Sequence, residues 1–160
     1  MKTTKVVLKS LVVLGAVFAL AACGSKQEST STSSSTTETV VLKDGTYKAE
    51  SGFDERGWKF VHEITVEGGK ITASTADYED KDGNLKSENA EYNTMMEEKS
   101  GISSAEATDK LDEELLAAQS ADVEVVTGAT HTSENFKKST EALLKAAEEG
   151  NTDTITLKFE

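Results

Sequence analysis

The sequence predicts an α+β fold, with a single domain at residues 40–160 in which an antiparallel β-sheet meander packs against helices. Two observations predict this class. Runs of alternating apolar and polar residues, separated by glycine-containing turns, fill the first half of the domain, and apolar residues at helical spacing fill most of the second half. Strands that precede helices in this way favour α+β over an alternating βαβ arrangement. A region of about 120 residues is long enough for one hydrophobic core.

The first half contains three expected strands, at residues 46–50, 59–66 and 71–78. The middle strand alternates regularly, so one of its faces is formed by Phe60, His62, Ile64 and Val66. Glycine-containing stretches at 52–58, 67–70 and 82–84 indicate the loops and turns. The connection at 67–70 has hairpin length and therefore predicts antiparallel pairing of its neighbours.

The second half should begin with a short helix from near Glu88 to before Gly101, with Tyr92, Met95 and Met96 on one face. A second helix begins with a capping box of Ser103 and Glu106. Its expected apolar face consists of Ala107, Leu111, Leu115 and Ala118.

A strand at 123–126, a third helix and a final strand at 152–160 should complete the domain. Apolar and small residues at i, i+4, i+7, i+8 and i+11 indicate the third helix, and they are Phe136, Thr140, Leu143, Leu144 and Ala147. Gly150 stands where a left-handed C-terminal cap is expected. In the final strand, the inward-facing side chains should be Ile155, Leu157 and Phe159.

The connection at residues 125–133, which precedes the third helix, is rich in small and hydroxyl-bearing residues. Thr132 or Ser133 can cap the helix, and Glu134 then lies in the first turn, where the helix dipole favours negative charge. Thr130 is thereby placed at a helix N-terminus, whose free amides suit an anion such as phosphate. The alternative is a capped turn whose hydroxyls only satisfy backbone groups.

The N-terminus has the pattern of a bacterial lipoprotein signal peptide at residues 1–22. Lys2, Lys5 and Lys9 form a positive region, and the apolar run at 11–22 is too short to span a bilayer comfortably. Leu20-Ala21-Ala22-Cys23 resembles the lipobox, which implies cleavage before Cys23 and lipidation of its sulfur. We therefore expect a lipid-anchored (palmitate-type) protein on the extracytoplasmic face of the cell membrane.

Residues 23–39 are expected to be a lipidated cysteine followed by a flexible linker, because serine and threonine dominate and no apolar cluster is available. Removal of the signal segment leaves 14 lysine and arginine residues against 29 acidic residues, a net charge of −15. Such a charge argues against nucleic acid as a partner. Cys23 is the only cysteine, so no intrachain disulfide can form.

Several other residues have a structural interpretation beside a functional one. His62 lies on a strand without a second histidine at ligand spacing, and His131 lacks a recognisable nucleophile and acid, so neither a metal site nor a triad is indicated. The carboxylates at 77–82 depart from calcium-loop spacing and are interpreted as a solvated turn. The Tyr92, Met95 and Met96 stripe could form core or contact a planar ligand, and Trp58 could lie in the core or at a pocket rim.

Several short motifs resemble landmarks of the FMN-binding domain family. Thr127-Gly128-Ala129-Thr130 is similar to the family's [Ser/Thr]-Gly-Ala-Thr motif. The other landmarks follow in the family's usual order, and they are Asp44-Gly45-Thr46-Tyr47, Gly52-Phe53, Gly57-Trp58, Ile64-Thr65-Val66, Gly69-Lys70-Ile71, Tyr92 with Met96, and the helix containing Phe136. The resemblance covers residues 43–147, nearly the whole domain.

The resemblance implies a covalently bound FMN. In the family, a flavin transferase that uses FAD joins the last threonine of the motif to the phosphate of FMN, and this residue is Thr130 here. Thr127, Gly128 and Ala129 form the recognition frame, and Glu124 stands where the family usually has aspartate. The candidates for contact with the isoalloxazine ring are Trp58, Tyr92 and Met96.

The family includes flavin-carrying subunits of sodium-pumping and related electron-transport complexes, and surface lipoproteins of extracellular electron transfer. The resemblance therefore implies a membrane-anchored carrier that receives electrons from a membrane quinone or dehydrogenase and passes them to an external acceptor, rather than an enzyme with its own substrate. Two rival hypotheses come from other classes. One is a surface lipoprotein that binds a non-flavin ligand or peptide, and the other is the precursor of a pheromone derived from the signal peptide.

Overall fold

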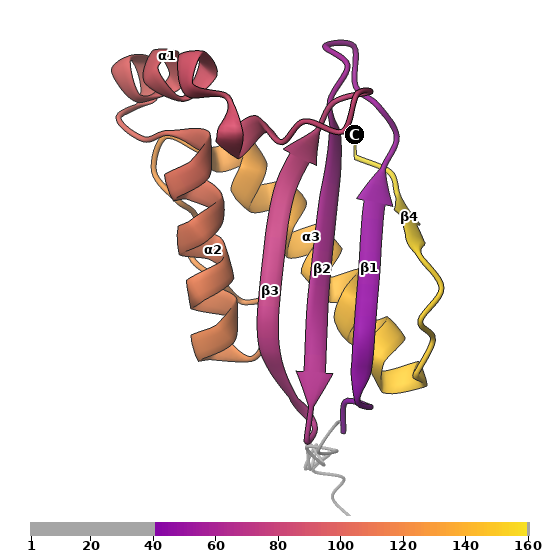
Figure 1. Cartoon of the computed structure of the whole chain (residues 1–160). Coiled ribbons are helices and arrows are strands. Elements are labelled where there is room, and N and C mark those ends of the chain that lie inside the picture. Colours follow the sequence, from indigo (N-terminus) through magenta and orange to yellow (C-terminus); the bar gives the residue numbers. More distant parts are fainter. Residues whose placement is uncertain (1–40, 160) are drawn as a thin grey trace, which may run out of the picture. The chain divides into compact units, whose positions relative to one another are not determined.

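The structure is a computed structural model that describes residues 41–159. The expected signal peptide, Cys23 and the linker at 23–39 lie outside the described residues. In chain order (Figure 1), the elements are β1 (Gly45–Ser51), β2 (Lys59–Glu67), β3 (Lys70–Glu79), the 3-10 helix η1 (Lys86–Glu88), α1 (Ala90–Ser100), α2 (Ser104–Ala118), α3 (Thr130–Glu149) and β4 (Ile155–Leu157).

The four strands form one sheet in the order β3-β2-β1-β4. Strands β1, β2 and β3 pair antiparallel, as the hairpin-length connections predict, and Ala49 lies opposite His62 in the register of β1 and β2. Strand β4 pairs parallel with β1, because the chain returns to this edge through α3 (Figure 1). The expected α+β class is therefore confirmed, with a mostly antiparallel sheet.

Helix α3 covers one face of the sheet against β1 and β2, and α2 packs beside β3 (Figure 1). Alternation along β2 sends its predicted apolar face toward α3, so Phe60, Ile64 and Val66 are buried. The buried residues that α2 and α3 contribute include Ala107, Leu111, Leu115, Phe136, Leu143 and Ala147. Burial of these side chains removes apolar surface from water and holds the two layers together.

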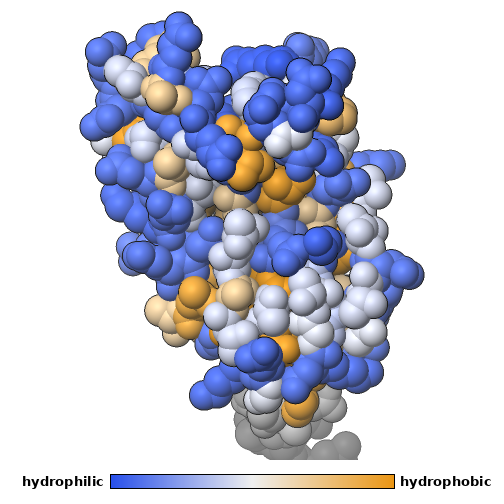
Figure 2. Space-filling model, in the orientation of Figure 1, coloured by the Kyte–Doolittle hydropathy of each residue, from blue (hydrophilic) through white to orange (hydrophobic). Residues whose placement is uncertain are grey.

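Within residues 41–159, no helix covers the opposite face of the sheet, and this face is polar. Lys48 and Glu63 pair across β1 and β2 at 2.5 Å, and Lys59 lies between Glu50 and Glu79 at 3.2 and 3.4 Å. Figure 2 shows that hydrophilic residues cover much of this view of the molecule. Exposed and partly exposed ion pairs contribute little to stability individually, so the helix-covered face is the main source of packing energy.

The segment at 123–126 is not a strand, contrary to the sequence-based expectation. Its backbone groups bond to side chains instead of to a neighbouring strand: the Glu124 amide donates to Glu114 Oε2 at 2.8 Å, and the Val126 amide donates to Ser133 Oγ at 3.0 Å. Val123 and Val126 are buried while Val125 is half exposed. The apolar residues therefore anchor a connection between α2 and α3.

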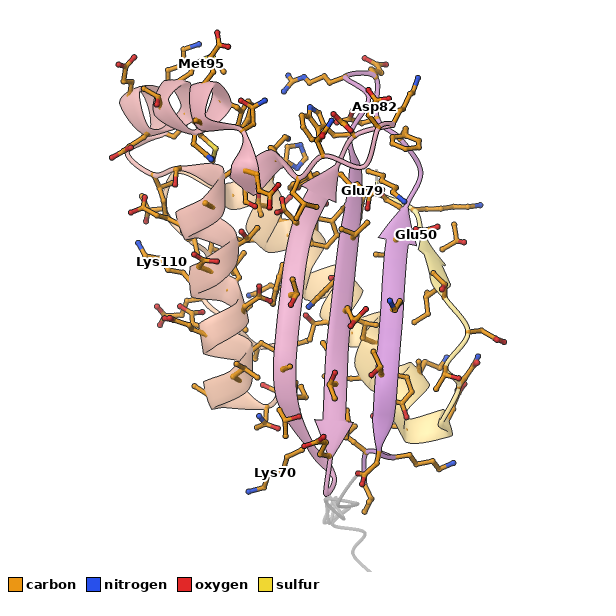
Figure 3. The ribbon with its side chains drawn as sticks, viewed as in Figure 1. Glu50, Lys70, Glu79, Asp82, Met95 and Lys110 are labelled. Carbon is orange, nitrogen blue, oxygen red and sulfur yellow. The ribbon has the colours of Figure 1, made fainter. Side chains whose placement is uncertain are left out.

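Three further expectations were wrong in detail. Met95 lies on the outer side of α1, 42% exposed (Figure 3), because only Tyr92 and Met96 of the expected stripe turn toward the rest of the domain. Ala118 is exposed in the last turn of α2, where the contact with β3 is made instead by Gln119, which hydrogen-bonds to the Ile71 backbone. The final strand is limited to β4, because only residues 155–157 find partners on β1.

Candidate functional site

Helix α3 begins at Thr130, three residues after Thr127, and Ala129 occupies the N-cap position without a side-chain hydrogen bond to the helix. The expected cap at Thr132 or Ser133 is therefore wrong, and Glu134 lies beyond the first turn. Ser133 instead accepts from the Val126 amide and donates to the Ala129 carbonyl, both at 3.0 Å. This hydroxyl fixes the loop to the helix and leaves the first-turn amides without a capping side chain, which is the arrangement that suits an anion.

Gly128 fits the loop for two steric reasons. Its φ of 86° lies in the left-handed region, where side chains are strained. A Cβ at this position would also overlap the Ser100 carbonyl oxygen and lie 3.1 Å from Ile102 Cγ2. The glycine of the motif thus lets the loop pack directly against the end of α1.

A cavity of about 660 Å³ opens beside the start of α3. It is lined by the β1–β2 loop, the ends of β2 and β3, η1, α1, the first turn of α3 and the segment after β4, which gather at the upper end of the sheet in Figure 1. Of the sequence-predicted site residues, the cavity brings together Trp58, Tyr92, Met96, Gly128, Ala129 and Thr130. Residues from distant parts of the sequence therefore line the same cavity as Thr130.

Two predicted site residues lie outside this lining. Thr127 and Glu124 are exposed on the segment that leads to α3, and neither borders the cavity. Their place on the surface makes them accessible from solution, whereas Thr130 is both exposed and part of the cavity wall.

Aromatic side chains form the floor and one wall of the cavity. Phe60 makes edge-to-face contacts with Tyr78 and Phe159, with ring centroids 5.1 and 5.8 Å apart. Asn135 Nδ2 of α3 donates to Tyr78 Oη at 3.0 Å, which fixes the phenol, and burial raises the pKa of Tyr78. The Tyr78 hydroxyl therefore stays protonated at neutral pH.

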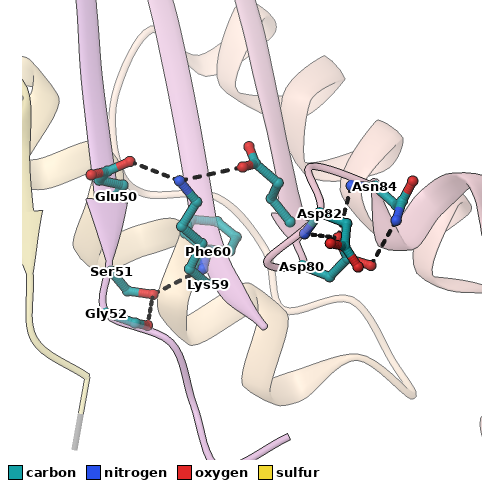
Figure 4. A network of polar contacts seen from close by, with 9 residues as sticks. Glu50, Ser51, Gly52, Lys59, Phe60, Asp80, Asp82 and Asn84 are labelled. Atoms are coloured by element: carbon teal, nitrogen blue, oxygen red, sulfur yellow. Dashed lines mark hydrogen bonds and ion pairs between the residues drawn. The ribbon is translucent and has the colours of Figure 1, made fainter. Parts of the chain in front are cut away.

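The β1–β2 loop holds Trp58 through a carboxylate. Asp54 Oδ1 accepts from the backbone amides of Arg56 and Trp58, both at 2.9 Å, and closes a tight turn. At the base of this loop, Ser51 Oγ accepts from the Phe60 amide at 2.9 Å (Figure 4). These bonds give the tryptophan a defined position at the cavity.

The acidic stretch at 77–82 is only partly the solvated turn that the sequence predicts. Asp80 is exposed and accepts from Asp82 and Asn84 (Figure 4), and these bonds lower its pKa. Asp77, in contrast, is buried and accepts from the amides of Tyr78 and Ser87 at 2.6 and 3.3 Å. Asp77 thereby ties η1 to the end of β3, because a buried carboxylate needs such donors.

Sequence reasoning missed Lys86, the lysine of η1. Its Nζ lies 4.2 Å from the Tyr78 ring centroid, 4.9 Å from that of Tyr92 and 5.0 Å from that of Trp58. The side chain is 9% exposed, and burial lowers its pKa. No local pattern marks this lysine, because its three aromatic neighbours come from separate segments that only the fold brings together. Arg56, Lys158 and His131 also line the cavity.

A second polar cluster lies between the sheet and the helices, and we call it the buried polar chain: Asp112, Ser74, His62 and Ser139. His62 Nδ1 lies 2.6 Å from Ser139 Oγ, and its Nε2 lies 3.0 Å from Ser74 Oγ. Ser74 Oγ in turn contacts Asp112 Oδ1, and Asp112 Oδ2 accepts from the Ala76 amide at 3.0 Å. The structural interpretation of His62 agrees with these contacts.

Comparisons with known proteins agree with the motifs. The sequence model of the protein family described as the FMN-binding domain matches residues 57–145 of this chain. The 15 kDa lipoprotein of Treponema pallidum (strain Nichols) is 40% identical over 116 residues, which are 71% of this chain and 82% of the relative. The chain belongs to the FMN-binding domain family.

A solved structure supports the same assignment for the fold of this FMN-binding domain. The CPE2226 protein from Clostridium perfringens matches with a TM-score of 0.72 and 40% identity, over 74% of this chain and 99% of the other. Among the described residues, no helix combines the length and apolar character that a membrane span needs.

The cavity of this FMN-binding domain fits a flavin mononucleotide by its own chemistry. Its volume lies in the usual range of about 300–1,000 Å³ for small-molecule sites. Among the described residues, three cationic groups line the cavity, those of Arg56, Lys86 and Lys158, against the single carboxylate of Asp54. A cationic cavity in a chain of net charge −12 is complementary to a phosphate, and the aromatic walls are complementary to a planar ring.

Proposed function

We propose that this chain is a lipid-anchored extracytoplasmic flavoprotein that carries FMN covalently on Thr130 and relays electrons between a membrane donor and an external acceptor. One observation carries the proposal: Thr130 is the first residue of α3, whose N-terminus has no side-chain cap, and it lines a cationic, aromatic cavity. A phosphate joined to this hydroxyl remains beside the first-turn amides and the positive end of the helix dipole.

The attachment needs a modifying enzyme, because a threonine hydroxyl is a weak nucleophile without a general base. In this proposal a flavin transferase uses FAD: the Thr130 oxygen forms the new bond to the phosphorus of the FMN moiety, and AMP leaves. Glu124 and Thr127 are exposed beside the site and outside the cavity, so they are available for recognition by the transferase.

Once bound, FMN supplies one- and two-electron chemistry, and the protein supplies orientation and electrostatics. The walls formed by Trp58, Tyr92 and Met96 can hold the ring, and Lys158 and Arg56 add positive charge. A covalent bond also suits an exported protein, since a dissociable cofactor would be lost by dilution. The relative named as a lipoprotein supports the lipid anchor at Cys23, which lies outside the described residues.

Intact mass spectrometry of the full chain produced with its transferase, FAD and magnesium tests the attachment. The wild type should gain one FMN minus one water and turn yellow, and Thr130→Val should lose the adduct. Thr132→Val is the matched control, because Thr132 also lines the cavity but lies two residues into the helix, and it should keep the adduct.

Two results would contradict the proposal in different ways. An unmodified wild type, in cells where another substrate of the transferase is modified, rejects the flavin carrier and favours a surface lipoprotein with a non-flavin ligand or a pheromone precursor. An adduct that persists in Thr130→Val rejects only the site of attachment.

The anchor and the relay need separate measurements. Cys23→Ser should move the protein from the membrane fraction to the soluble fraction, because the variant lacks the sulfur atom that would carry the lipid. Membranes that contain a reduced quinone pool should bleach the flavin absorbance of the anchored protein, and an added soluble acceptor should restore it. Absence of bleaching with an intact adduct would reject the quinone-linked donor.

A further inference from the structure

Lys86 occupies an unusual position for a lysine in a short surface turn. Its ammonium group is surrounded by the rings of Trp58, Tyr78 and Tyr92, at 4.2–5.0 Å from their centroids. None of the ion pairs within residues 41–159 involves it. The negative faces of the three rings partly replace water around the charge.

The backbone around Lys86 is fixed independently of the side chain. Asp77 accepts from the Ser87 amide, Asn93 Nδ2 donates to the Ser87 carbonyl at 2.6 Å, and the Lys86 carbonyl accepts from the Asn89 amide at 3.1 Å. A lysine side chain on such a turn can normally extend into water with little loss of energy. Lys81, in the preceding turn, does so and is exposed.

The charge of Lys86 therefore points into the cavity, although desolvation opposes it. The other charged groups around Lys86 are Asp54, Arg56 and Asp77. Asp54 and Asp77 already accept from backbone amides, so their negative charge is partly neutralised by those donors. Lys86 and Arg56 are thus matched in formal charge by Asp54 and Asp77, and Lys158 adds a further cation to the cavity lining.

We propose that Lys86 is a positioning residue that raises the reduction potential of the flavin, by holding a positive charge against the aromatic wall of the cavity. This inference rests on the proposed function, because it needs FMN on Thr130. Two-electron reduction of a flavin at neutral pH takes up two electrons and one proton, so the reduced ring carries one additional negative charge. In the relay, those electrons come from a reduced quinone. A cation held in a low-dielectric cavity stabilises the added charge.

The test compares flavinylated full-length wild type with Lys86→Met and Lys86→Arg by redox titration. Lys86→Met should lower the ratio of reduced to oxidised flavin about tenfold at a fixed ambient potential, which is about 30 mV for a two-electron couple. Lys86→Arg keeps the charge and should restore most of the potential. Lys81→Met removes an exposed lysine outside the cavity and should leave the potential unchanged.

A second measurement, on protein without flavin, reports on the contact between Lys86 and the aromatic wall. The chain has one tryptophan, so the tryptophan fluorescence of unmodified protein comes from Trp58 alone, whose ring centroid lies 5.0 Å from Lys86 Nζ. Its emission should change in Lys86→Met and stay constant in Lys81→Met. If Lys86→Met does not fold, Lys86→Gln removes the charge while retaining a polar side chain, and the same lowering of the potential is expected.

The outcomes separate this inference from the proposed function. A wild type that never acquires FMN rejects the proposed function. FMN attached to both proteins, with equal potentials in the wild type and Lys86→Met, rejects the role of Lys86 and leaves the flavin carrier intact. An unchanged Trp58 emission in Lys86→Met rejects the placement of the ammonium against the aromatic wall.

Discussion

The cavity and the buried polar chain are two polar assemblies built by the same sheet and helices, and they differ in how their polar groups are satisfied. In the buried polar chain, both nitrogens of His62 and both oxygens of Asp112 have partners inside the protein. In the cavity, Thr130 is exposed and the ammonium of Lys86 has aromatic neighbours in place of a carboxylate. Complete internal pairing is typical of a structural role, whereas groups that face an open cavity are available to a ligand.

The donors and acceptors of the buried polar chain can be assigned from its hydrogen bonds. Ser139 Oγ donates to the Phe136 carbonyl at 2.8 Å, so His62 Nδ1 donates to Ser139 and His62 Nε2 accepts from Ser74. This arrangement uses the single hydroxyl hydrogen of Ser74, so it holds only when the Asp112 carboxyl is protonated and donates to Ser74; when the carboxylate is ionised, Ser74 donates to Asp112 Oδ1 instead. Burial raises the pKa of Asp112 to about 6 and lowers that of His62 to about 3, so both groups are neutral between about pH 3 and pH 6, and Asp112 ionises above that range.

The largest expected effect concerns the glycine that shapes the cavity wall. Gly128→Ala should lower the free energy of unfolding by about 3 kcal/mol, because the new methyl group overlaps the Ser100 carbonyl and the backbone has positive φ. Gly83→Ala is the matched control, since Gly83 has a φ of 85° but no neighbour within 4 Å. Gly83→Ala should lower the free energy of unfolding, measured by urea titration, by only about 1 kcal/mol. Equal losses in the two variants would show that the loop does not pack against α1.

The second effect is the pH dependence of the buried polar chain. A raised pKa of Asp112 contributes stability that is present below its ordinary value of 3.8 and is lost as pH rises through about 6. A lowered pKa of His62 contributes stability that is present above 6.5 and is lost as pH falls through about 3. In the pH range where both groups act, they change the free energy of unfolding in opposite directions as pH rises. The stability of the wild type should therefore depend only weakly on pH in this range.

Single substitutions should separate the two slopes. In His62→Gln, the free energy of unfolding should fall by about 2 kcal/mol from pH 4 to pH 6, a value that allows for the partial exposure of Asp112. In Asp112→Asn, the free energy should instead rise with pH over the same range. Urea titrations at several pH values measure both. Slopes of the same sign in the two variants would contradict a neutral Asp112 and His62 pair.

The difference between the two assemblies also explains how far the sequence could predict the molecule. Strand β2 was predictable because alternation is a local signal, and Gly150 because a left-handed cap is a local requirement. The motif at 127–130 indicated Thr130. The cap of α3 was not predictable, since Ser133 accepts from the Val126 amide and not from an amide of the first helical turn. Lys86 was not predictable either, because its surroundings depend on three separate segments.

A third prediction compares two hydroxyls of the same loop. Ser133→Ala should lower the free energy of unfolding by about 1.5 kcal/mol, because the buried Val126 amide loses its acceptor. Thr130→Val should change it by less than about 0.5 kcal/mol, because Thr130 is exposed. Thermal or urea unfolding of the protein without flavin measures both. If Thr130→Val is the more damaging substitution, the Thr130 hydroxyl has a structural role that the contacts do not show.

The smallest expected effect concerns the second histidine. His131 lines the cavity but is 85% exposed, and its Nδ1 lies 4.0 Å from Glu134 Oε2. An exposed pair of this kind contributes at most a few tenths of a kcal/mol, so His131→Ala should leave the free energy of unfolding within about 0.5 kcal/mol of the wild type. His62→Ala, measured in parallel, should lose several times more, because Ser74 and Ser139 would both lose a partner in the core. Similar losses for the two histidines would show that the cavity edge is as tightly organised as the interior, and the contrast between an open site and a closed polar chain would then fail.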